Sequence, residues 1–158
     1  MSFDSTEMRV RRMNAADVAR VMEIASNLKD APRWPEWAYL EAVQLESHRR
    51  IALVAEGSGT GEVAGFLVAG LVLPDAELEM VAVTAEHQRR GVGRLLIGAL
   101  IEELKRREGT AVLLEARASN VAAVELYRTS GFRETGRRQR YYADPIEDAV
   151  LMKLVLSV

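Results

Sequence analysis

Apolar residues follow two different spacings along the chain, and together these predict alternating strands and helices. Short apolar runs bounded by turn residues are typical of β-strands. They predict strands at residues 8–13, 51–56, 63–73, 78–83, 111–114, 141–142 and 149–156. Apolar positions three and four residues apart, and residues that start and stop helices, are typical of amphipathic helices. They predict helices at residues 15–25, 35–45, 94–107 and 121–129.

Residues at the element ends agree with these boundaries. Asn14 is placed to cap the first helix, and either Ser119 or Asn120 the last one. Gly131 follows the last helix, where glycine is favoured. The glycine-rich turn at residues 57–61 joins two strands into a hairpin. An early hairpin followed by strand–helix–strand units predicts an α/β fold, with a mixed sheet and helices on both faces.

Size, composition and charge narrow the class of protein. A chain of 158 residues is long enough for one domain with its own core, so we expect a single domain over residues 1–158. The net charge of −2 does not indicate general affinity for nucleic acid. No apolar run approaches the length that spans a membrane, and the first residues are polar. We therefore expect no membrane association and a cytoplasmic location.

The cysteine and histidine content limits the available chemistry. The chain has no cysteine, which excludes disulfides, thiolate metal sites and a covalent acyl-cysteine intermediate. His48 and His87 are the only histidines, and no metal-ligand spacing surrounds them. The sequence therefore predicts no bound metal.

A loop with two glycines connects a predicted strand to the helix that follows it. Its sequence is Gln88-Arg89-Arg90-Gly91-Val92-Gly93. A helix start offers unpaired N–H groups and a positive dipole end, and glycine lets the backbone approach an anion closely. Arg89, Arg90 and Arg94 add positive charge. The spacing matches neither the dinucleotide fingerprint nor the ATP/GTP phosphate loop, so two interpretations remain: a phosphate site, or an ordinary turn with solvated arginines.

Acidic and phenolic side chains near this loop could transfer protons. Glu115 follows the apolar strand at residues 111–114, at the strand end where open α/β sheets place ligands. Tyr127 lies on the next helix. On pattern alone, Glu115 could be a solvated carboxylate and Tyr127 a packing residue. Glu77 and Glu79 share one face of the strand before the glycine loop, and either could be on the surface or lie beside the site.

The loop at residues 88–93 resembles the Gln/Arg-x-x-Gly-x-Gly/Ala motif of the Gcn5-related N-acetyltransferases. The resemblance covers about residues 78–154 and is vague before them. Several segments are similar to the bacterial enzymes that acetylate the N-terminal alanine of a small-subunit ribosomal protein. These segments are residues 114–120, 122–123, 126–127, 131–132, 138–142 and 147–149.

This resemblance implies a mostly antiparallel sheet and acetyl-coenzyme A (acetyl-CoA) as the acetyl donor. It implies that Glu115 is the general base and Tyr127 the general acid. The implied cofactor contacts come from main-chain groups of one strand and the glycine loop, and from one helix-capping residue. They are Val81, Ala82, Val83, Arg89, Arg90, Gly91, Val92, Gly93, Arg94 and Asn120.

Three positions depart from the family pattern. Met80 replaces an asparagine, residues 143–146 lack a glycine often found after the tandem tyrosines, and the segment at residues 34–35 fits loosely. The last two departures could reshape acceptor binding. The expected acceptor is the N-terminal α-amine of a protein, with a small-subunit ribosomal protein as the candidate substrate, and the alternative is a lysine side chain, polyamine, amino acid or drug. A coenzyme A-binding regulator without turnover is a further alternative, against which the presence of both Glu115 and Tyr127 argues.

Overall fold

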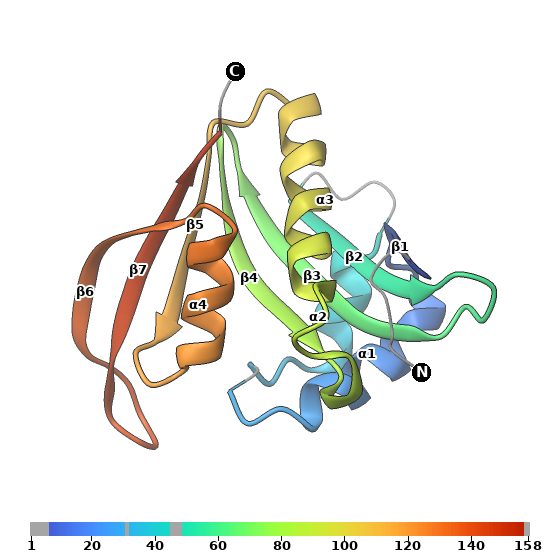
Figure 1. Ribbon diagram of the computed structural model, residues 1–158, viewed down its shortest axis with the longest axis horizontal. Coiled ribbons are helices and arrows are strands. Elements are labelled where there is room, and N and C mark those ends of the chain that lie inside the picture. Colours follow the sequence, from blue (N-terminus) through green and yellow to red (C-terminus); the bar gives the residue numbers. More distant parts are fainter. Residues whose placement is uncertain (1–6, 31, 45–48, 157–158) are drawn as a thin grey trace.

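A twisted seven-stranded sheet runs through the centre of the protein (Figure 1). The computed structural model describes residues 7–30, 32–44 and 49–156, so His48 and the predicted helix end at Leu45 lie outside the described part. The strands are β1 (Met8–Arg12), β2 (Arg50–Gly57), β3 (Val63–Val72), β4 (Asp75–Val83), β5 (Ala111–Arg117), β6 (Arg133–Tyr142) and β7 (Glu147–Val155). The α-helices are α1 (Val18–Ser26), α2 (Glu36–Ala42), α3 (Val92–Arg106) and α4 (Val121–Thr129), with 3-10 turns η2 (Ala15–Asp17) and η3 (Ala85–His87).

Neighbouring strands follow the order β1-β2-β3-β4-β5-β7-β6. Every neighbouring pair is antiparallel except β4 and β5, which are parallel. The expectation of a mixed, mostly antiparallel sheet is therefore confirmed. Because β4 and β5 are parallel, their C-terminal ends point to the same end of the sheet. The glycine loop, which follows β4, and the end of β5 therefore lie at that same end.

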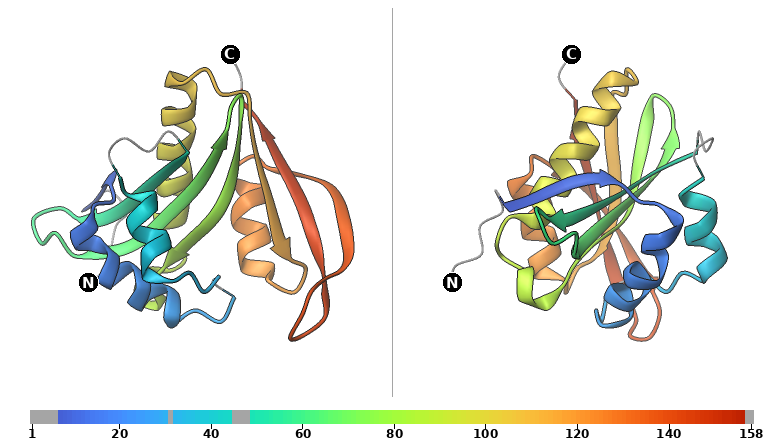
Figure 2. Two further views of the ribbon diagram at one scale, coloured as in Figure 1. Left: turned by 180° about the vertical axis from the view of Figure 1, so that it is seen from behind. Right: turned by 90° about the vertical axis from the view of Figure 1, so that its right-hand side faces the viewer.

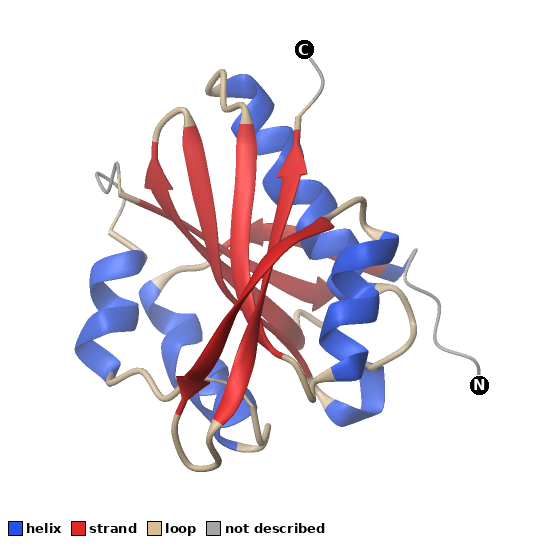
Figure 3. Ribbon diagram, turned by 90° about the vertical axis from the view of Figure 1, so that its left-hand side faces the viewer, coloured by secondary structure: helices blue, strands red, loops and turns tan. Residues whose placement is uncertain are grey.

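Helices cover both faces of the sheet, as expected (Figures 2 and 3). On one face, Leu96 and Leu100 of α3 are buried in a core cluster that includes Leu67 of β3. The helix α4 adds partly buried residues to the same cluster. On the other face, α1 and α2 pack in a second cluster, where Val21 of α1 is buried with Phe66 of β3. The sheet therefore separates two apolar cores.

A β-bulge in β4 changes which side chains face α3. Leu78 and Met80 pair with consecutive residues of β3, so Glu79 is the extra residue. Strand alternation would put Leu78 and Met80 on one face, yet Leu78 lies in the core under α3 and Met80 in the opposite core. Beyond the bulge, Val81 packs against the α3 side. Glu79 forms a 3.0 Å ion pair with Arg50 of β2.

Two predicted boundaries are wrong in ways that affect the candidate site. The strand β5 continues to Arg117, so Glu115 lies inside the strand and not at its end. The continuous apolar run stops before this segment. Ala116 is nevertheless buried, because alternate residues of the strand continue to face the core. The strand β6 begins at Arg133 and not at residue 141, because it is an edge strand whose mostly polar, exposed residues carry no apolar signal.

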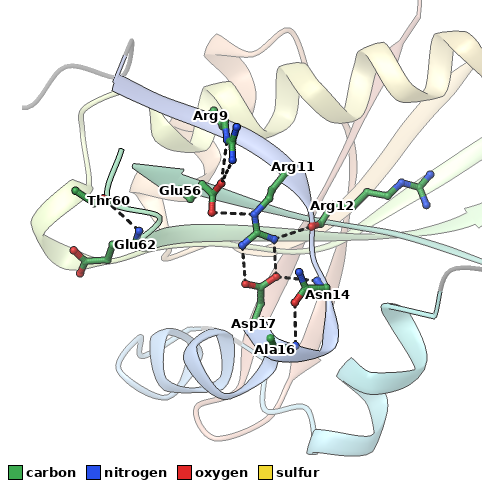
Figure 4. A network of polar contacts seen from close by, with 9 residues as sticks. All are labelled: Arg9, Arg11, Arg12, Asn14, Ala16, Asp17, Glu56, Thr60 and Glu62. Carbon is green, nitrogen blue, oxygen red and sulfur yellow. Dashed lines mark hydrogen bonds and ion pairs between the residues drawn. The ribbon is translucent and has the colours of Figure 1, made fainter. Parts of the chain in front are cut away.

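An ion-pair network connects β1 to β2 and to the start of α1 (Figure 4). Arg11 donates two 2.8 Å hydrogen bonds to Asp17 and lies 2.9 Å from Glu56, which also accepts a 2.8 Å hydrogen bond from Arg9. Asp17 accepts the main-chain N–H of Asn14 as well, in a capping box. Both carboxylates are buried. Hydrogen bonds from Arg11 lower the pKa of Asp17, and hydrogen bonds from Arg9 and then Arg11 lower the pKa of Glu56.

This network predicts a loss of stability in acid. A carboxyl group whose pKa is lowered by folding stabilises the protein above its ordinary pKa, here 3.8 for Asp17 and 4.5 for Glu56, and the contribution is lost as the pH falls below these values. We expect Arg11→Gln to lower the thermal midpoint at pH 7 by about 5 °C and to weaken its dependence on pH below about 5.

Thermal unfolding followed by circular dichroism between pH 7 and pH 3 measures both effects. Arg12→Gln is the matched control, since Arg12 pairs with Glu103 in a largely exposed contact. The same acid dependence in Arg11→Gln and in the wild type would contradict the assigned role of the network.

Candidate active site

The parallel strands β4 and β5 separate soon after they pair. Their pairing ends at Glu77 and Leu113, whereas β4 continues to Val83 and β5 to Arg117. Figure 1 shows the two strands diverging from a common end. Among the described residues, no strand pairs with β4 on this side beyond Glu77. Main-chain groups of β4 are therefore available there to an extended ligand.

The helix α3 begins inside the glycine loop, at Val92 and not at residue 94 as predicted. Gly91 precedes it with a φ of 83°, in the left-handed region that glycine tolerates best. The N–H of Leu95 donates to the carbonyl of Gly91 (2.9 Å), and the N–H groups before it point out of the first turn. The side chain of Gln88 donates to the carbonyl of Val83 (3.0 Å). This bond fixes the loop to the end of β4.

Gly93 lets α3 and α4 approach each other closely. A Cβ atom at this position would lie 2.9 Å from Cδ2 of Leu126 on α4. Arg94 adds a second contact between the helices, since its guanidinium donates to Oγ1 of Thr129 (2.9 Å). The side chain of Arg94 was expected to add charge beside a phosphate, but it is directed towards α4 instead.

The helix α4 carries Tyr127. Asn120 caps this helix, as predicted, by accepting the N–H of Ala123 (3.2 Å). The ring of Tyr127 packs against Phe132, with 5.9 Å between the ring centroids. Burial, and secondly the nearby Tyr142, raise the pKa of Tyr127 to about 12. The Tyr127 hydroxyl therefore keeps its proton at neutral pH.

Glu115 lies among side chains of the edge strand β6. Nε of Arg138 is 3.6 Å from Oε1 of Glu115. A hydrogen bond to Glu115 is the main cause that raises the pKa of Tyr141. Burial and then the charge of Glu115 raise the pKa of Tyr142, which in turn contributes to the raised pKa of Tyr127. Tyr142 is thus electrostatically coupled to both predicted catalytic residues.

The carboxylate of Glu77 interacts electrostatically with both Glu79 and Glu115. Burial, then Glu79 and then Glu115, raise the pKa of Glu77. Glu79 is paired with Arg50, whose guanidinium lies 5.3 Å from the ring centroid of Trp34. Arg50 therefore offsets the charge of Glu79, which leaves Glu77 as the further carboxylate beside Glu115.

Tyr142 thus interacts electrostatically with Glu115 and with Tyr127, and the glycine loop leaves the sheet at the end to which β5 also runs. Arg89 and Arg90 are exposed in that loop. The sequence did not single out Arg117 or Arg50, because their contacts depend on strand register. Arg117 and its partner Glu147 lie in the adjacent strands β5 and β7, whereas Arg50 of β2 reaches Glu79 of β4 across β3, and neither pairing can be read without the register.

Two further observations concern the described part of the chain. No helix there is long and apolar enough to cross a membrane. No group of three or more histidine, cysteine, aspartate or glutamate side chains is arranged there to hold a metal ion.

Comparison with known proteins decides the family. The acetyltransferase (GNAT) family model matches residues 18–132. The chain belongs to the acetyltransferase (GNAT) family. It is 35% identical to a ribosomal protein bS18-alanine N-acetyltransferase of Salmonella typhimurium, over 92% of this chain and 96% of that protein. It is therefore an N-acetyltransferase that uses acetyl-CoA.

Solved structures agree in fold. The ribosomal-protein-S18-alanine N-acetyltransferase from Escherichia coli has a TM-score of 0.82 and 32% identity, and the match covers 96% of this chain and 95% of that one. The structure of yncA from Salmonella typhimurium with its cofactor acetyl-CoA has a TM-score of 0.78 and 25% identity, over 96% of this chain and 95% of that chain.

Proposed function

We propose that this acetyltransferase modifies the free α-amine of a protein N-terminus, with alanine as the preferred first residue. The observation that supports the proposal is that Tyr142 interacts electrostatically with both Glu115 of β5 and Tyr127 of α4, beside the strands β4 and β5 that diverge. The names of its relatives support the acceptor, since the Salmonella and Escherichia coli proteins act on the alanine of ribosomal protein bS18. A small-subunit ribosomal protein is therefore the proposed natural substrate.

The proposed cofactor site combines the unpaired stretch of β4 with the start of α3. Main-chain groups of residues 81–83 would hold the pantetheine arm, because no other strand of the described sheet pairs with them on that side. N–H groups of residues 89–94 would bind the pyrophosphate at the positive end of the α3 dipole. Asn120 would contact the cofactor from the start of α4.

Glu115 is the proposed general base. A protonated amine cannot attack a thioester, and near pH 7.4 about a fifth of α-amines but only about a thousandth of lysine amines are neutral. A carboxylate, acting directly or through water, therefore removes the proton of an α-amine more readily than that of a lysine amine. The neighbouring Glu77 would add negative charge that attracts the ammonium form of the acceptor, whereas Arg50 offsets the charge of Glu79.

Tyr127 is the proposed general acid for the departing thiolate. Its pKa of about 12 keeps the hydroxyl protonated throughout the working pH range. A phenol with its ordinary pKa near 10 would match a thiol with a pKa near 8.5 more closely. The raised pKa of Tyr127 therefore makes proton transfer to the departing thiolate less favourable. A main-chain N–H of β4 would stabilise the thioester oxygen as it becomes negative. The chain has no cysteine that could form an acyl-cysteine intermediate, and the proposed mechanism is direct transfer of the acetyl group from donor to acceptor in a ternary complex.

We expect Glu115→Gln and Tyr127→Phe each to lower kcat by about two to four powers of ten, with little loss of acetyl-CoA affinity, because each removes a proton acceptor or donor from the reacting atoms. Part of the Glu115→Gln loss should return at high pH, where the acceptor amine deprotonates by itself. Steady-state kinetics from pH 6 to pH 10 measure both effects.

Glu79→Gln is the matched control for this experiment, because it removes a carboxylate near the same site. It should retain kcat within a few-fold of the wild type. Near-wild-type rates in Glu115→Gln, with a large loss in Glu79→Gln, would move the role of base to Glu79.

The acceptor class is tested with three substrates at equal concentration: a peptide that begins with alanine, the same peptide with a blocked N-terminus and an internal lysine, and a free polyamine. We expect acetylation of the alanine α-amine at least about a hundred times faster than of the lysine, given their different neutral fractions. Mass spectrometry locates the acetyl group. Faster reaction of the lysine peptide or the polyamine would overturn the proposed acceptor and leave the acetyltransferase activity intact.

A further inference from the structure

Arg117, the last residue of β5, makes four contacts with the hairpin that joins β6 to β7. Its guanidinium donates to the carbonyl of Ala143 (3.1 Å), the carbonyl of Pro145 (3.2 Å) and the carboxylate of Glu147 (3.2 Å). It also lies 4.5 Å from the ring centroid of Tyr142. The side chain is only 21% exposed, so these contacts are partly shielded from water.

The residues after Arg117 reinforce the same connection. Glu147 accepts hydrogen bonds from the N–H of Ser119 (3.1 Å) and from its hydroxyl (2.9 Å). These bonds and the guanidinium of Arg117 lower the pKa of Glu147. The N–H of Ala118 donates to the carbonyl of Asp148 (3.1 Å). Three consecutive residues therefore attach the start of the β5–α4 loop to the hairpin.

The hairpin turn at residues 143–146 has little packing of its own. All four of its residues are exposed, and Asp144 has a φ of 52° in a turn without glycine. Only a planar, forked donor can reach two carbonyls and a carboxylate at once while its face covers a ring. A lysine carries the same charge, but its single ammonium cannot make this set of contacts.

We propose that Arg117 is a positioning residue for acceptor binding. It holds Tyr142 and the turn at residues 143–146 against the β5–α4 loop, so that the hairpin, whose Arg138 and Tyr141 lie beside Glu115, keeps a fixed place where an acceptor amine would meet Glu115. The proposal rests on the proposed function for the role of Glu115. Arg117 itself does not touch Glu115 in the contacts above and acts through Tyr142.

The first test is kinetic and uses Arg117→Lys and Arg117→Gln. Each variant should raise the acceptor KM at least about tenfold, while kcat and the acetyl-CoA KM stay within about threefold of the wild type. Arg137→Gln is the matched control, because Arg137 lies on the same hairpin but pairs with Glu134 three residues earlier (2.9 Å). It should leave all three constants unchanged. The acceptor used is the amine with which the wild type turns over fastest.

The second test does not depend on the identity of the acceptor. Hydrogen–deuterium exchange of the chain without substrate should show faster exchange at residues 141–148 in Arg117→Gln than in the wild type and Arg137→Gln. Unchanged exchange at these residues would show that the contacts of Arg117 do not restrain the hairpin, whatever the acceptor is. Faster exchange with an unchanged acceptor KM, or an equal loss of acceptor and acetyl-CoA affinity, would overturn the positioning role.

Discussion

The separation of β4 from β5 is the constraint on which the rest of the site depends. The two strands pair in parallel only as far as Glu77 and Leu113, and the bulge at Glu79 follows directly. A bulge bends its strand and increases the local twist, which suits a strand that is leaving its neighbour. Because β4 has no partner on that side beyond Glu77 among the described strands, its main chain can bind an extended ligand. The same bulge returns Val81 to the α3 side of the sheet, and Glu79, the extra residue, forms an ion pair with Arg50.

Arginine side chains connect elements that are distant in sequence at several places in the molecule. Arg11 joins β1 to β2 and to the first helix through buried carboxylates. Arg117 joins β5 to the last hairpin, and Arg94 joins α3 to α4. The first of these contacts stabilises the half of the molecule that lies away from the candidate site. The other two lie next to it: Arg94 beside the proposed cofactor site and Arg117 beside the proposed acceptor site.

Much of this architecture could be predicted from the sequence, because its elements carry local signals. The apolar stripe and the glycine loop predicted α3, and Asn120 was recognisable as a helix cap. The long edge strand β6 could not be predicted, because its polar residues owe their strand conformation to pairing with β7. The roles of Arg94 and Gly93 were only partly predictable, since their contacts with α4 depend on how two helices pack. Arg117 and Arg138 reach their partners through strand register, which no local pattern in one sequence encodes.

The proposed mechanism requires acetyl-CoA to bind where β4 leaves β5 and α3 begins. A titration of the 15N-labelled protein with coenzyme A, followed by amide NMR shifts, locates the binding site. Binding at this place should give the largest shifts at residues 81–83, 89–94 and 120, with β1 and β2 nearly unchanged. Shifts confined to another part of the surface would contradict it, for example the hollow of about 450 Å³ lined by Arg9, Glu56 and the turn at residues 57–61.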